Sequence, residues 1–243
     1  MTAFRALILS EARLLLRDPV TLLAAVVLPS VVLLLFGGVF GNDPDPALGG
    51  RRWIEMFVPS LVVITVGTLG IQTLPVRLAT YREKGVLRRL GTTPVHPAAL
   101  LAAQLVLYAA TSVVALVLLI AVASVAYDIP FPRDLAGYVA AFLLGMTSLF
   151  AIGLLLAAVA PSARAATSIA IPLFFAVMFL GGVYMPRALL PEIVQRIGEF
   201  TPPGVPALTD AWLGTAPQLA PLAAMAIGTV VVGALATRLF RWE

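Results

Sequence analysis

Long apolar segments alternate with short polar ones along the whole chain. Each apolar segment is long enough to cross the roughly 30 Å hydrocarbon core of a bilayer, which takes about 20 residues of α-helix. Because that core offers no water to the backbone, each segment is expected to be helical. The pattern therefore predicts an all-α, polytopic membrane protein with six transmembrane helices. The predicted spans cover residues 20–40, 56–76, 98–127, 135–160, 165–185 and 211–237.

Two of these spans have open boundaries. Residues 98–127 exceed what a bilayer requires, so this helix is expected to begin inside the loop that precedes it. The last span contains Pro217 and Pro221, which interrupt a helix interior. The first residues of this segment therefore either begin the span or form a separate short helix before it.

Two further segments are amphipathic rather than uniformly apolar. Residues 2–18 place apolar and polar side chains on two sides of a helix, which predicts a helix lying in the membrane interface. The apolar side holds Phe4, Ile8, Ala12, Leu15 and Leu16, and the polar side holds Ser10, Glu11, Arg13 and Arg17. Residues 186–210 carry apolar side chains at helical spacing between polar ends, which predicts short re-entrant helices between spans five and six.

The charged residues lie between the spans and orient them. If the N-terminus is cytoplasmic, the cytoplasmic side holds 11 of the 16 Lys and Arg residues and the outer side holds 5. This asymmetry follows the positive-inside rule. It predicts a multi-pass protein of the cell (plasma or inner) membrane with both termini in the cytoplasm.

Composition narrows the function classes. Hydrophobic residues make up 60% of the chain and the mean hydropathy is +1.02, whereas soluble domains are about 45–50% apolar. The spans use most of the 243 residues, so a single transmembrane domain, 1–243, is predicted. The basic residues flank spans, so no nucleic-acid partner is expected. The chain has no cysteine and a single histidine, His96, which argues against disulfides and Cys- or His-based metal sites.

No charged residue falls in the central part of any predicted span. Proton- and sodium-coupled carriers generally need an intramembrane carboxylate or a discontinuous helix, and membrane enzymes need a cluster of acids, His or a nucleophile. We therefore expect no catalytic and no metal-binding residues. The single lysine, Lys84, does not lie in a phosphate-binding loop. Any nucleotide hydrolysis is thus expected on another subunit.

The most informative polar stretch is the loop 77–100. Its charged residues alternate with leucines, which predicts a short helix that breaks at 91–94. One interpretation is a solvated basic anchor; the other is a docking helix for a cytoplasmic partner. Glu83 is the only acid among five basic residues, and its spacing also allows a surface ion pair with Arg82 or Arg88.

This loop and a later segment resemble the type-2 ABC exporter permeases, in particular their drug-resistance (daunorubicin-type) branch. Residues 82–90, REKGVLRRL, followed by Thr93-Pro94-Val95, are similar to the family's "RE-x-G-T-L-x-R-L…TP" stretch, with Val86 where Thr is common. Residues 181–186, GGVYMP, followed by Leu190-Pro191 and residues 200–202, FTP, are similar to its segment after span five.

The resemblance implies a permease subunit that works as a dimer, with an identical or homologous second permease, on two cytoplasmic ABC ATPase subunits. No cofactor is expected on this chain, and ATP and Mg would bind to the ATPase partners. The interfacial helix and the loop after span two would rest on those partners. The implied coupling residues are Arg82, Glu83, Gly85, Leu87, Arg88 and Leu90, with Arg13 and Arg17 as secondary contacts.

The same resemblance implies a substrate pathway between two protomers, lined by spans one, two and five. The pathway candidates are Thr65, Thr68 and Gln72 in span two and Phe174, Phe175, Met178 and Phe179 in span five. Ordinary helix packing is the competing interpretation for each of them, and Gly67, Gly70, Gly145 and Gly153 are expected to be close-packing positions. The outer re-entrant segment would form an extracellular gate. Its candidate residues are Tyr184, Met185, Pro186, Pro191 and Pro202.

An uncharged, aromatic pathway favours a hydrophobic or amphiphilic cargo. The sequence thus predicts the permease half of an ATP-driven exporter, active in drug efflux or antibiotic resistance or on a lipid-like molecule. A polysaccharide or glycolipid exporter of the same family is the main alternative. A secondary carrier and a membrane-embedded lipid enzyme are disfavoured by the missing intramembrane charge and acidic cluster.

Overall fold

The computed structural model describes residues 2–40, 43–46, 50–91, 98–184, 191–202 and 204–240. Within these residues, six helices are long and apolar enough to span a membrane. The prediction of an all-α, multi-pass membrane protein is therefore confirmed. The six spans are Pro19–Val39, Trp53–Glu83, Ala98–Tyr127, Leu135–Val159, Ala163–Leu180 and Leu219–Leu239.

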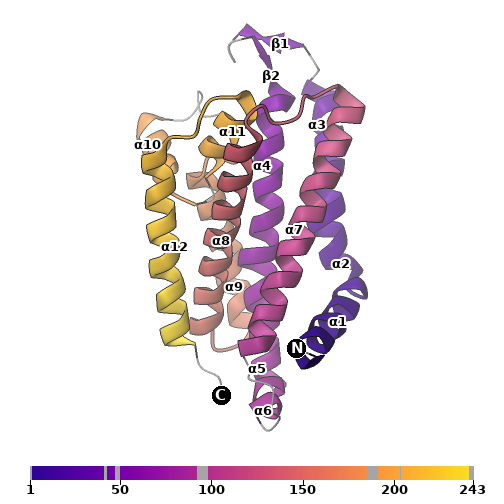
Figure 1. The fold of residues 1–243 in the computed structure, drawn as a ribbon, viewed down its shortest axis with the longest axis vertical. Helices are drawn as coiled ribbons and strands as arrows, with labels where there is room; N and C mark the ends of the chain where they lie inside the picture. The colour runs from indigo at the N-terminus through magenta and orange to yellow at the C-terminus, as the bar shows by residue number, and fades with distance from the viewer. Residues whose placement is uncertain are drawn as a thin grey trace.

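The second span forms the centre of the bundle and is the most buried of the six. It is built from α4 (Trp53–Gly67), a π-helical turn η3 (Thr68–Thr73) and α5 (Leu74–Glu83). On one side it contacts α3 (Leu28–Phe40) and α7 (Ala98–Tyr127), and on the other α8 (Leu135–Val159) and α9 (Ala163–Leu180). The last helix, α12 (Leu219–Leu239), packs on the outside of α8 (Figure 1).

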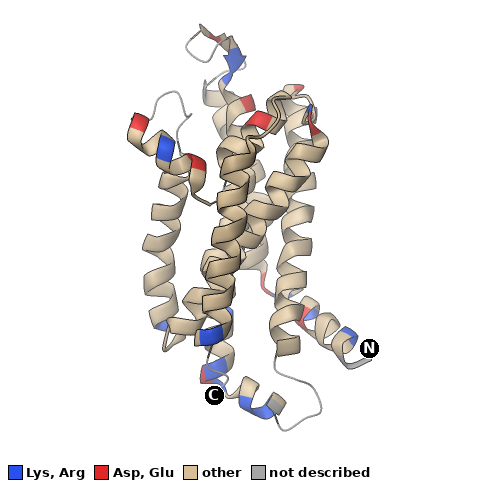
Figure 2. Cartoon of the chain, turned by 60° about the vertical axis from the view of Figure 1, so that its left-hand side comes forward, with Lys and Arg blue, Asp and Glu red and all other residues tan. Residues whose placement is uncertain are grey.

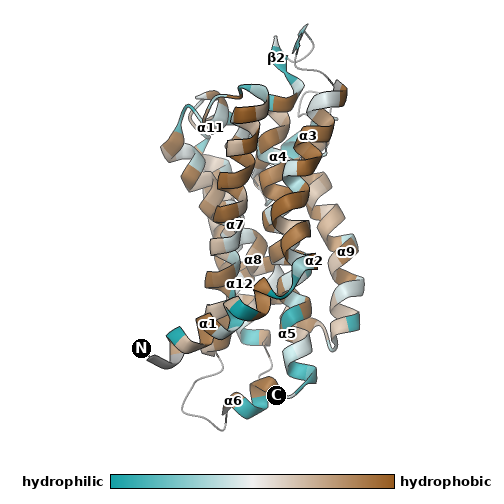
Figure 3. Ribbon diagram, turned by 90° about the vertical axis from the view of Figure 1, so that its right-hand side faces the viewer, coloured by the Kyte–Doolittle hydropathy of each residue, from teal (hydrophilic) through white to brown (hydrophobic). Residues whose placement is uncertain are grey.

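Charged residues gather at the two ends of this bundle, and the helices between them are almost entirely uncharged (Figure 2). We call the end that holds the start of α1 and the end of α12 the termini end. The other end carries a two-stranded hairpin of β1 (Pro44–Asp45) and β2 (Arg51–Arg52), and we call it the hairpin end (Figure 1). The apolar belt between them has the hydropathy of a membrane-spanning bundle (Figure 3).

The N-terminal helix α1 (Thr2–Leu16) lies across the termini end instead of along the bundle axis (Figure 3). Glu11, expected on the polar side of this helix, is only 6% exposed. The prediction was wrong at this position because Glu11 finds hydrogen-bonding partners in the bundle.

The first span begins where the sequence breaks α1. Asp18 caps α2 (Pro19–Leu22): its Oδ1 accepts a hydrogen bond from the Thr21 backbone N–H at 3.2 Å. Proline suits the first turn of a helix because the missing N–H would be unpaired there. The span continues through a π-helical turn, η1 (Leu23–Val27), into α3.

The second span crosses α8 at an unusually close approach. A Cβ added to Gly153 would collide with the backbone oxygen of Gly70 in η3. Glycine at both positions lets the two backbones touch. Two of the predicted close-packing glycines thus meet each other, and a third, Gly67, packs against Met178 of α9.

The loop after the second span folds differently from the prediction. The helix ends at Glu83, and Gly85, with φ +65°, turns the chain into a separate helix α6 (Val86–Gly91). A glycine in the left-handed region just past a helix is a common helix terminator. The predicted single helix is therefore wrong: the chain already breaks at Lys84–Gly85. Residues 92–94 of the predicted break lie outside the described residues.

Two short helices precede the last span. They are α10 (Glu192–Phe200) and α11 (Val205–Leu213), and α11 packs against α8 and α4. Glycines with positive φ, Gly204 and Gly214, flank α11. The sixth span begins at Leu219 and not at residue 211, because Gly214 ends α11 and the chain has no helix at 215–218. The alternative of a separate short helix is the one observed.

Candidate functional site

The termini end presents a bent segment, Leu74–Gly91, that we call the elbow. It consists of α5, the Lys84–Gly85 turn and α6. Leu87 is 2% exposed and anchors α6, while Lys84, Arg88 and Arg89 are exposed. The elbow thus offers a basic outer surface on a segment that is continuous with the central span.

Arg82 and Glu83 connect the elbow to the turn between α8 and α9. The Arg82 guanidinium donates to the backbone carbonyl oxygens of Ala157, at 3.4 Å, and Ala160. The Glu83 carboxylate accepts a hydrogen bond of 2.9 Å from the Ala163 N–H in the first turn of α9. A carboxylate at this position also interacts favourably with the helix dipole. These two residues therefore link α5, α8 and α9, and the Glu83 carboxylate is hydrogen-bonded to the first turn of α9.

A buried polar cluster joins α1 to the same part of the bundle. The Glu11 carboxylate accepts hydrogen bonds from the Tyr81 hydroxyl, at 2.7 Å, and from the Gln104 amide of α7. The Arg77 guanidinium lies over the Tyr81 ring, 5.6 Å from its centroid, and 4.0 Å from the Asp18 carboxylate. The sequence analysis missed this cluster because its members are far apart in the chain.

The secondary coupling candidates on α1 lie outside this cluster. Arg13 and Arg17 are both exposed at the termini end. Gly85 provides the turn of the elbow, and Leu90 lies half-buried on α6. The eight predicted coupling residues thus divide into exposed cations and residues that shape or anchor the elbow.

The pathway candidates are not brought together on one surface. The Thr65 and Thr68 hydroxyls donate to the carbonyl oxygens of Leu61 and Ile64 within their own helix. In α9, Phe174 and Met178 are buried against Gly67, whereas Phe175 and Phe179 are 55% and 50% exposed. The predicted aromatic stripe is therefore half core and half surface.

Gln72 lies in a different setting, a recess of about 580 Å³ at the termini end. The recess lies between the first, second and fifth spans and the end of α1. Its lining includes many polar side chains, among them Asp18, Thr21, Thr73, Arg77, Thr80 and Thr167.

The gate candidates lie around the end of α9. The Tyr184 ring stacks on that of Phe175, with centroids 6.3 Å apart, and partial burial raises the pKa of its hydroxyl. Pro191 precedes α10 and Pro202 follows it. Met185 and Pro186 lie outside the described residues.

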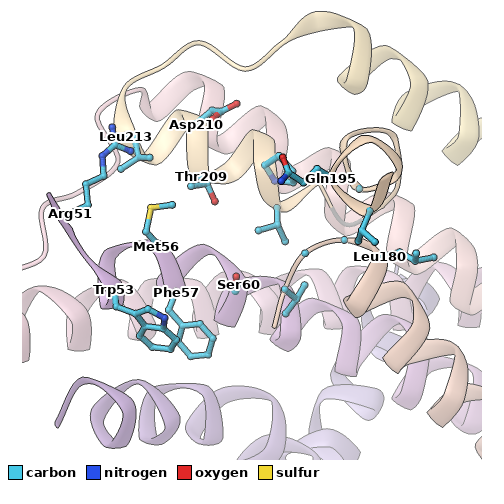
Figure 4. Close-up of a pocket in the computed structure, with 17 residues that line it drawn as sticks. Arg51, Trp53, Met56, Phe57, Ser60, Leu180, Gln195, Thr209, Asp210 and Leu213 are labelled. Carbon is cyan, nitrogen blue, oxygen red and sulfur yellow. The ribbon is translucent and has the colours of Figure 1, made fainter. Parts of the chain in front are cut away.

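The hairpin end contains a cavity of about 350 Å³ that the sequence analysis did not anticipate. Side chains of α4, α10 and α11 and the turn after α9 line it (Figure 4). The amphipathic pattern of residues 186–210 was the available signal, because it predicted helices folded back over the bundle. No group of acids, His or Cys suited to a metal ion occurs among the described residues.

Comparison with known proteins identifies the family. Residues 2–203 match the family model described as ABC-2 type transporter. The chain belongs to the ABC-2 type transporter family. It is also 25% identical, over 198 residues, to the Bacillus subtilis (strain 168) protein named "Putative transport permease YvfS". That alignment covers 80% of this chain and 78% of the relative.

Membership of the ABC-2 type transporter family confirms the resemblance seen in the elbow and in the segment after the fifth span. It indicates that the chain is a component of a transporter. The roles of the individual coupling, pathway and gate residues stay predictions.

Proposed function

We propose that this ABC-2 type chain is the permease subunit of an ATP-driven exporter, coupled to two separate ATPase subunits that bind ATP and Mg. The observation that carries the proposal is the elbow. It continues the most buried span beyond the bundle and presents Lys84, Arg88 and Arg89 to the surroundings. A partner that moves the elbow would therefore act directly on the centre of the bundle.

The hydrogen bonds of Arg82 and Glu83 would also transmit motion of the elbow to a second part of the bundle. They attach the elbow to the end of α8 and the start of α9. Displacement of the elbow would thus shift the second and fifth spans together. We propose that closure of the ATPases tilts α1 and the elbow and opens a pathway between two permease protomers, with both termini in the cytoplasm.

We propose a hydrophobic or amphiphilic cargo, such as a drug, an antibiotic or a lipid-like molecule. The exposed Phe175 and Phe179 offer a surface of α9 that suits either a second permease or an apolar cargo. A specific observation supports the alternative cargo, a polysaccharide or glycolipid: the recess beside Gln72 is rich in hydroxyl and charged groups. An amphiphile with a polar head satisfies both observations.

The test is purification of the chain from its own cells in mild detergent, followed by identification of bound proteins by mass spectrometry. We expect a stoichiometric ATPase, and we expect the R88E variant to lose it. Arg88 is exposed, and reversal of its charge leaves the buried contacts of Arg82 and Leu87 in place.

The matched control is R133E, which reverses an exposed arginine at the hairpin end. It should retain the ATPase. Recovery of the intact chain without any ATPase would refute the proposal. Equal loss in R88E and R133E would refute the elbow as the docking surface.

A further inference from the structure

The cavity at the hairpin end has the composition of a ligand site. Its volume of about 350 Å³ falls in the range of small-molecule pockets, about 300–1,000 Å³. Its walls are mainly apolar and aromatic, with Met56, Phe57 and Val183 among them, and a few polar groups project into it. Such pockets bind through the apolar walls and select through the few polar groups.

Two hydroxyl groups in the cavity lack hydrogen-bonding partners. Ser60 of α4 is 4% exposed, and Thr209 of α11 faces it across the cavity (Figure 4). Throughout the described part of the chain, no hydrogen bond involves either hydroxyl. Both oxygens remain accessible from the cavity, so a molecule inside it could supply the missing partner.

Many other helical hydroxyls in this protein have a partner in their own helix, although those of Ser30 and Ser112 also have none. Threonines elsewhere donate to the carbonyl oxygen four residues earlier in their own helix, the usual solution in apolar surroundings. They are Thr65, Thr68, Thr80, Thr111, Thr147, Thr167 and Thr229. Ser60 and Thr209 instead direct their oxygens into the cavity, where a ligand could bond both.

Two glycines shape the backbone around the cavity. Gly198 of α10 lies so close to the fifth span that an added Cβ would be 2.6 Å from the Leu180 carbonyl oxygen. Gly182, with φ +72°, turns the chain after α9. Arg51 and Asp210 both line this cavity, so its charged residues are of both signs and a ligand with a net charge is not favoured.

We propose that this cavity binds a small amphiphile that carries hydroxyl or carbonyl groups on an apolar body, with Ser60 and Thr209 as its hydrogen-bonding partners. Its place on the export path, as a site occupied before release, rests on the proposed function. Binding of the amphiphile does not rest on the proposed function, because the cavity lies within one chain and at the end opposite the elbow.

The absence of cysteine from the chain provides a direct test. The L213C variant, which places a thiol in the cavity and keeps both hydroxyls, would be placed in lipid nanodiscs and modified with a small methanethiosulfonate reagent. The probe is 1-monooctanoylglycerol, which has two hydroxyls, an ester carbonyl and an apolar chain. At about ten times its Kd, the probe should slow the modification about tenfold, because only the unoccupied fraction reacts.

Two further variants make the result specific. T215C places the same thiol on an exposed residue of the turn after α11, outside the cavity, and its rate should not change. Adding S60A to L213C should raise the half-protecting probe concentration about three- to tenfold, the equivalent of one lost hydrogen bond.

No protection of L213C at saturating probe would overturn the proposal, and so would equal protection of T215C, which indicates a bilayer effect. An unchanged half-protecting concentration in S60A/L213C would overturn the role of the Ser60 hydroxyl. The protection assay needs neither nucleotide nor ATPase. If the probe protects the thiol but no ATPase copurifies with the chain, the proposed function is refuted and the ligand site is not.

Discussion

The two ends of the bundle are held together by different interactions. At the termini end, charged side chains connect helices: Glu11 joins α1 to Tyr81 and Gln104, and Arg82 and Glu83 join the elbow to the α8–α9 turn. At the hairpin end, Arg52 joins β2 to the end of α7 through the Tyr127 carbonyl oxygen, at 2.7 Å. The short helix α11 at that end instead buries apolar residues against α8 and α4, beside a cavity that contains unpartnered hydroxyls.

This difference gives the two regions different mechanical properties: one transmits motion and the other can change its packing. Directional hydrogen bonds and ion pairs fix the relative positions of the helices they join, so the termini end suits transmission of motion. Apolar contacts have no directional requirement, so the apolar face of α11 can change its packing around a ligand. The Gly70–Gly153 contact lies between the two ends and connects them through α8 and η3.

The largest expected effect is at this central contact. In G153A, the new methyl group would collide with the Gly70 backbone oxygen, and backbone atoms cannot rotate away as a side chain can. We expect destabilisation at or above the upper end of the roughly 1–3 kcal/mol typical of overpacking. Thermal unfolding in detergent, followed by circular dichroism, measures it.

The control is G228A in α12, where an added Cβ meets nothing within 4 Å. Since glycine in a helix interior is about 1 kcal/mol less favourable than alanine, this variant should be as stable as the original chain or more so. If G153A and G228A unfold alike, the close approach does not hold the two ends together.

A smaller but still large effect is expected from the buried acid of α1. In E11A, the Tyr81 hydroxyl and the Gln104 amide lose their shared acceptor inside the bundle. A buried donor left unpaired costs about 1–3 kcal/mol. E11Q keeps an acceptor oxygen in place and should retain most of the stability. An equal loss in E11A and E11Q would show that the negative charge matters, and not the hydrogen bonds.

The ease of prediction from the sequence also differs between local and distant features. The spans followed from apolar length, and the start of α12 followed the signal of Pro217, because both depend on neighbouring residues. The inward position of Glu11 depends on Tyr81 and Gln104, which are 70 and 93 residues away in the sequence. Helical periodicity reflects only residues that are close in sequence, so it cannot indicate these distant contacts.

The elbow and the cavity show the same limit in two further ways. The leucine spacing on either side of Gly85 suggested a continuous helix, although a glycine can end one. The cavity is assembled from α4, α10, α11 and the turn after α9. Its lining is therefore a tertiary property, and the sequence indicated only that α10 would be amphipathic.

The smallest of these effects is expected at Glu83, the exposed acid of the termini end. E83A removes one acceptor from the first turn of α9, where the Ser162 side chain also accepts a bond, from the Ala165 N–H. Loss of one of two capping groups should cost about 0.5–1 kcal/mol. Thermal unfolding measures this change.

E83Q distinguishes a structural from a coupling role for the same residue. Its amide oxygen can still cap α9, so E83Q should unfold like the original chain. If Glu83 acts only through α9, the ATPase rate of the reconstituted complex should also be normal in E83Q and reduced in E83A. If the partner contacts the carboxylate itself, both variants should reduce that rate while only E83A loses stability. The second result would make Glu83 part of the docking surface, and the first would confine that surface to the exposed cations of the elbow.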